Sequence, residues 1–123
     1  MVLTVKTRCR NCIFILICLV FPPGVFGHAI LVTSTPKANE TMTGPNITLA
    51  LTFNLKVDQA RSVLLLEQSD HSTSKVAINR DRSSPERLTG TCPRLAPGVY
   101  KLHWQVLAVD GHITRGEFAF QVK

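Results

Sequence analysis

The chain has 123 residues, a formal net charge of +6 at pH 7 and a hydrophobic content of 45%. A chain of this length forms at most one domain. Its basic residues are scattered and form no run interleaved with aromatic residues, so composition gives little support to nucleic-acid binding.

The first 27 residues have the layout of a secretory signal peptide. Lys6, Arg8 and Arg10 form a positive start, an unbroken apolar run follows at 12–21, and Pro and Gly at 22–24 precede a cleavage site at 25–27. A membrane anchor is the alternative, but a spanning helix needs roughly 20 apolar residues, about twice the length of this run. We therefore predict that residues 1–27 are cut off during export and that residues 28–123 form the domain.

Loss of this segment changes the charge and the cysteine count. Three of the 14 basic residues leave, so eleven basic residues face eight acidic ones and the net charge falls to +3. Of the four cysteines only Cys92 remains, and it cannot form an internal disulfide. We expect Cys92 to be a half-buried small hydrophobic residue and not an exposed metal-binding thiol.

Apolar and polar residues alternate along much of the remaining chain, which is the pattern of half-buried β-strands. One segment, 63–66, is apolar throughout, which indicates a strand covered on both faces. Turn-forming residues separate the segments, and a helical period is nowhere sustained over three turns. About seven short strands predict an all-β, antiparallel Greek-key sandwich or barrel. In chain order the predicted strands are 29–33, 47–53, 63–66, 75–78, 87–91, 100–106 and 117–122.

Histidines at the two ends of this domain are candidate metal ligands. After cleavage His28 is the first residue, so its α-amino nitrogen and its Nδ1 can chelate one metal ion together. Asp110 and His112 add a carboxylate and an imidazole, on one face if the segment is a strand, or closer together if Gly111 makes a turn. Two or three nitrogens and one oxygen in a plane suit Cu(II) better than Zn(II), which prefers a tetrahedron. By its spacing alone, Asp-Gly-His also fits an ordinary hairpin with a solvated histidine.

The candidate ligands belong to a longer pattern of short segments. These are His-Ala at 28–29, L-V-T-S-T-P at 31–36, L-T-F at 51–53, G-V-Y-K-L-H-W at 98–104, V-D-G-H at 109–112 and G-E-F-A-F at 116–120. Together they resemble the CopC (copper-resistance protein C) family, which includes the YobA-like periplasmic proteins. The resemblance covers essentially all of residues 28–123 and implies an Ig-like β-sandwich in the periplasm.

The resemblance also implies a ligand set and a role. One Cu(II) ion would be bound by the amine and imidazole of His28, the imidazole of His112 and the carboxylate of Asp110. Family members carry copper for resistance, or supply it to an inner-membrane importer of the CopD type. We therefore expect a monomeric, non-catalytic protein that sequesters or delivers Cu(II).

This chain departs from its relatives at two places. Some relatives have a glutamate near the copper where this chain has Asn54. Some also have a methionine-rich segment that binds Cu(I), but the corresponding residues 68–75 contain no methionine, and Met42 is the one methionine after residue 27. Because soft Cu(I) prefers sulfur ligands, we expect a protein that binds Cu(II) only.

Four further side chains have simpler expected roles. We expect His71 to be a solvated loop residue and His103 to lie on the outer face of its strand, because Leu102 and Trp104 take the opposite phase. Trp104 and Tyr100 are expected in the core.

Two other functions remain as alternatives. The first is a copper oxidase or monooxygenase of the histidine-brace type, since such enzymes also bind copper through an N-terminal histidine and a second histidine. Asp110 as a fourth ligand would fill the position that oxygen chemistry needs open. The second is a metal-free Ig-like interaction module, which would follow if cleavage does not occur after Gly27.

Overall fold

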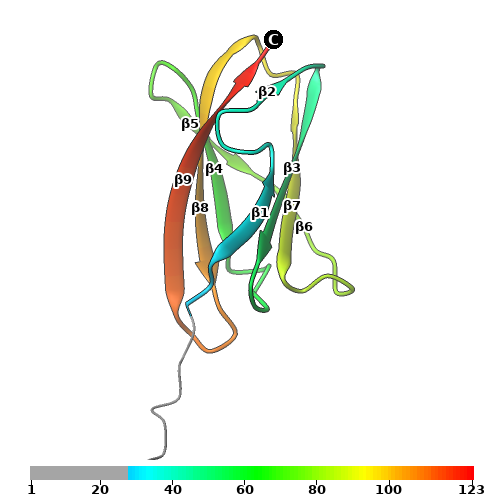
Figure 1. The fold of residues 1–123 in the computed structure, drawn as a ribbon, viewed down its shortest axis with the longest axis vertical. Helices are drawn as coiled ribbons and strands as arrows, with labels where there is room; N and C mark the ends of the chain where they lie inside the picture. Colours follow the sequence, from blue (N-terminus) through cyan, green and yellow to red (C-terminus); the bar gives the residue numbers. More distant parts are fainter. Residues whose placement is uncertain (1–27) are drawn as a thin grey trace, which may run out of the picture.

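The computed structural model describes residues 28–123, and the predicted signal peptide at 1–27 lies outside the described residues. Two β-sheets face each other (Figure 1). The described range contains no helix that could cross a membrane.

One sheet has the order β1 (Leu31–Thr35), β3 (Asn46–Phe53), β7 (Arg87–Pro93) and β6 (Ile78–Asn79). The other has the order β2 (Thr41–Met42), β9 (Ile113–Val122), β8 (Gly98–Leu107), β4 (Val63–Glu67) and β5 (Thr73–Val76).

The core lies between the two sheets and is made by alternate residues of each long strand. Along β8 the even-numbered side chains from Tyr100 to Val106 are buried and their neighbours are partly exposed. Trp104 on β8 meets Phe53 on β3 edge to face, with ring centroids 5.3 Å apart, so aromatic packing joins the sheets. The predicted core positions of Trp104 and Tyr100 are confirmed.

The predicted all-β class is confirmed, with corrections to its details. The chain forms a sandwich and not a closed barrel, and two of its nine described strands, β2 and β6, have only two residues each. Pairing is antiparallel except between β2 and β9, which run parallel.

Two expectations about burial were wrong. In β4, Leu64 and Leu66 are buried, but Val63 and Leu65 are half-buried on the outer face, where they line an open hollow. The strand is thus fully covered on one side only. Cys92 is 4% exposed and belongs to the core, so it is more deeply buried than expected.

One end of the sandwich brings together segments that are distant in the chain. The turn between β8 and β9, the residues before β1 and the segment after β3 all lie at the lower end in Figure 1. An isolated bridge between Val57 and Ala108 ties the segment after β3 to the β8–β9 turn. This end carries the candidate metal ligands.

Candidate metal centre

Asp110 and His112 lie in the turn between β8 and β9, not on a strand. Gly111 has a φ of 92°, a left-handed conformation that glycine adopts at little cost. The turn is closed by two backbone hydrogen bonds, from Ala108 N to His112 O at 2.8 Å and from Gly111 N to Ala108 O at 2.9 Å. The left-handed glycine between the two residues turns the chain back, so that both side chains can meet.

Both oxygens of the Asp110 carboxylate contact His112. Oδ1 accepts a hydrogen bond of 3.0 Å from the His112 backbone N–H, and Oδ2 lies 3.0 Å from Nδ1 of the ring. The backbone hydrogen bond, followed by the ring contact, lowers the pKa of Asp110 below its usual value. The carboxylate is therefore ionised, as a metal ligand must be, over a wider pH range than an isolated aspartate.

His28 reaches the same place from the other end of the described chain. Its ring meets that of His112 edge to face, with centroids 5.5 Å apart. Its neighbour Ala29 is buried in the core, and His28 itself is exposed. The structure thus brings all three candidate ligands from the sequence to one end of the sandwich.

The separation of the two imidazoles is compatible with two ligands of one metal ion, although the three side chains do not surround a common point. Two imidazoles on one ion place their centroids roughly 4 to 6 Å apart, a range that includes the His28–His112 separation. Among residues 28–123, no three His, Cys, Asp or Glu side chains form a ready metal-binding group.

A family model described as the CopC domain matches residues 31–123, which is most of the chain. The chain belongs to the CopC family. The match begins at Leu31 and does not cover His28.

Individual CopC-family proteins are similar along nearly their whole length. Protein YobA of Escherichia coli strain K12 is 28% identical over 116 residues, which cover 93% of this chain and 94% of YobA. Copper resistance protein C of Xanthomonas campestris pv. juglandis is 31% identical over 104 residues, covering 80% of this chain and 82% of that protein. The crystal structure of CopC from Methylosinus trichosporium OB3b gives a TM-score of 0.71 at 30% identity, over 78% of this chain and 94% of that one. The predicted family and the predicted β-sandwich are both confirmed.

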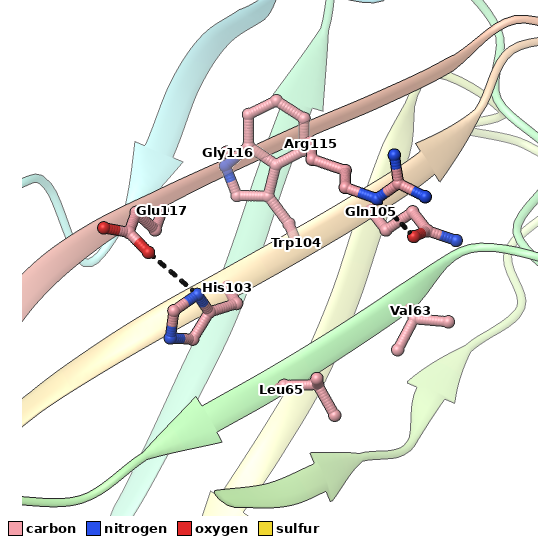
Figure 2. A pocket seen from close by; sticks show the side chains of 8 residues that line it. All are labelled: Val63, Leu65, His103, Trp104, Gln105, Arg115, Gly116 and Glu117. Carbon is pink, nitrogen blue, oxygen red and sulfur yellow. Dashed lines mark hydrogen bonds and ion pairs between the residues drawn. The ribbon is translucent and has the colours of Figure 1, made fainter. Parts of the chain in front are cut away.

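A second group of polar side chains occupies the outer face of the five-stranded sheet. His103 on β8 lies between two carboxylates: its Nε2 is 2.5 Å from Glu67 on β4, and its Nδ1 is 2.9 Å from Glu117 on β9. Figure 2 shows the Glu117–His103 contact beside the hollow that Val63 and Leu65 line. The predicted outward position of His103 is confirmed, but its ring contacts two carboxylates and it is not an isolated surface residue.

His71 joins the same group from the β4–β5 turn. Its side chain is 87% exposed, as predicted for a loop residue, yet its Nδ1 lies 2.8 Å from the other oxygen of Glu67. Lys101 Nζ completes the group at 3.6 Å from Glu117. Hydrogen bonds from His71 and then His103 lower the pKa of Glu67. Glu67 and Glu117 were missed from the sequence, because only the strand register places them beside His103.

Proposed function

We propose that this chain, once cut before His28, binds one Cu(II) ion and carries it in the periplasm. The ligands would be the α-amine and imidazole of His28, the imidazole of His112 and the carboxylate of Asp110. The observation that carries the proposal is the meeting of His28 with the Asp110–His112 pair at one end of the sandwich. The free amine of His28 would add a fourth donor to the three side chains.

The donor types favour Cu(II) over Cu(I). Nitrogen and carboxylate donors suit Cu(II), whereas Cu(I) prefers thiolate or thioether sulfur. Cys92 is buried in the core, and Met42 packs against the core from β2. Cys92 pairs with Ile47 near the start of β3, and Met42 pairs with Val122 at the end of β9, so neither sulfur is at the end of the sandwich that carries His28 and His112.

The surroundings of the cluster support delivery of copper to another protein. The three proposed ligands lie on exposed residues, and Ile30, Val109 and Ile113, each within two residues of a ligand, are at least half exposed. These apolar side chains would be available for contact with an acceptor protein that approaches the ligands. An inner-membrane importer of the CopD type would be the acceptor protein. If the protein instead carries copper for resistance, it uses the same copper site without such an acceptor.

Calorimetric titration of Cu(II) into the exported protein tests the ligand set. Mass spectrometry must first show that the purified protein begins at His28. Replacing His28 or His112 by Ala should weaken Cu(II) binding by more than about tenfold, because a lost ligand costs more than a lost outer contact. His103→Ala is the matched control and should bind like the parent. Equal affinity in all three variants would contradict the proposal.

A further inference from the structure

Asn54 forms a two-point contact with the residue that lies two positions after His28. Its side-chain Oδ1 accepts a hydrogen bond of 2.8 Å from the backbone N–H of Ile30, and its own backbone N–H donates one of 3.0 Å to Ile30 O. The last β1–β3 register pair is Leu31 with Phe53. The Asn54 side chain therefore extends this ladder by one residue beyond the end of the strands.

The residues that follow Asn54 are hydrogen-bonded to the chain just before Asp110 and His112. Asp58 N donates to Leu107 O at 2.8 Å, Val109 N donates to Lys56 O at 3.4 Å, and Val57 bridges to Ala108. The segment 54–58 thus lies between the N-terminal residues and the turn that carries Asp110 and His112. It fixes their separation through hydrogen bonds on both sides.

We infer that Asn54 is a positioning residue for copper, which holds the first residues of the cut chain in place so that His28 faces Asp110 and His112. The inference rests on the proposed function. Buried Ala29 fixes one residue after His28, and the Asn54–Ile30 contact fixes the next. Without the side-chain acceptor, the N-terminal residues keep one hydrogen bond to Asn54 instead of two. They then sample more conformations, and binding must order them at a cost in affinity.

The contact also argues against Asn54 as a copper ligand. Its Oδ1 already accepts the Ile30 hydrogen bond at a good distance of 2.8 Å. Binding of that oxygen to a metal ion would compete with this bond and loosen the segment that carries His28. Asn54 thus acts through the backbone of Ile30.

Three variants of the exported protein test this role, each with its N-terminus verified. Asn54→Ala removes the acceptor and should weaken Cu(II) binding about tenfold, the lower range for loss of an outer contact. Asn54→Asp keeps an oxygen acceptor and should restore most of the affinity. Asn46→Ala is the matched control, because Asn46 is an exposed asparagine at the opposite end of β3, and it should bind like the parent.

Two further readouts separate positioning from a general loss of structure. In the copper-free protein, Asn54→Ala should speed hydrogen exchange of the Ile30 amide and leave the β8–β9 ladder protected. At full loading its electron paramagnetic resonance spectrum should match that of the parent, because the donor atoms are unchanged.

Several results would overturn the inference. The first is an Asn54→Ala variant that binds Cu(II) as tightly as the parent, and the second is an Asn54→Asp variant that does not restore the affinity. The third is a changed electron paramagnetic resonance spectrum in copper-loaded Asn54→Ala, which would mean that Asn54 is a ligand. If the parent itself fails to bind Cu(II), the proposed function fails and the role of Asn54 fails with it. Tight binding by the parent with no loss in Asn54→Ala overturns the role of Asn54 alone.

Discussion

The imidazole of His28 meets the imidazole of His112 edge to face, at an interplanar angle of 77°. One residue precedes the first strand and the other precedes the last, yet the sandwich places them at the same end. The proposed copper site uses the backbone amine of His28, which would become free only when the preceding peptide bond is cut.

The dependence on a free amine predicts the effect of a one-residue extension. A glycine added before His28 converts its amine into an amide and moves the new amine away from the imidazole. We expect Cu(II) affinity to fall more than about tenfold, with the far-ultraviolet circular dichroism spectrum unchanged. A glycine added after Lys123 is the control and should have no effect. Calorimetry that gives the same affinity for both extended proteins would show that the amine is not a ligand.

The contacts of Glu67 with His71 and His103 predict that the stability of the protein depends on pH. Hydrogen bonds from His71 and His103 hold the pKa of Glu67 below its ordinary value of 4.5. A carboxyl group whose folded pKa is lowered stabilises the folded state above its unfolded pKa, and this contribution is lost as pH falls through the folded pKa. In urea unfolding, the stability difference between the parent and Glu67→Gln should therefore be largest above pH 4.5 and shrink below it.

Glu86→Gln provides the control for this measurement. The Glu86 side chain makes no hydrogen bond or ion pair within residues 28–123, so Glu86→Gln removes a carboxylate without removing such a contact and serves as the baseline. A Glu67→Gln difference that stays constant into acid would contradict the assigned role of the His71 and His103 contacts.

The close packing of Trp104 on Gly116 predicts a steric effect. The two residues are register partners on β8 and β9, and a Cβ added at Gly116 would overlap the indole ring (Figure 2). Trp104 also packs against Phe53, so a shift of its ring would disturb the core, and Gly116→Ala should destabilise the protein by about 1–3 kcal/mol. Urea unfolding measures the loss, and Trp104 fluorescence should change. Arg115→Ala, an exposed neighbour, should stay within about 0.5 kcal/mol of the parent.

Burial of Cys92 predicts slow thiol chemistry. Burial in the core raises the pKa of the Cys92 thiol, and the thiolate is the reactive form. A thiol reagent should label the folded protein, with or without copper, many times more slowly than the urea-unfolded protein. Rapid labelling of the folded state would show that the strand β7 opens readily.

The period of two along the chain predicted most of the long strands. The segments 47–53, 87–91 and 100–106 fall inside β3, β7 and β8. Each of these strands buries one face, so apolar and polar residues alternate along its own sequence. The predicted strand 75–78 was divided, since β5 ends at Val76 in one sheet and β6 begins at Ile78 in the other. Both sheets bury their inner face against the same core. The alternation of apolar residues therefore does not show where the chain passes from one sheet to the other. The short strand β2 was not predicted, because two residues show no period and its partner β9 is distant in the chain.

By itself, the sequence determined the class of fold, the family and the residue types suited to Cu(II), because these follow from local patterns and short motifs. Tertiary structure decided which side chains meet. The register of β4, β8 and β9 places Glu67 and Glu117 on either side of His103, and the segment 54–58 holds the N-terminal residues near the β8–β9 turn. Such contacts depend on pairing between distant segments, and no local pattern encodes the register of that pairing.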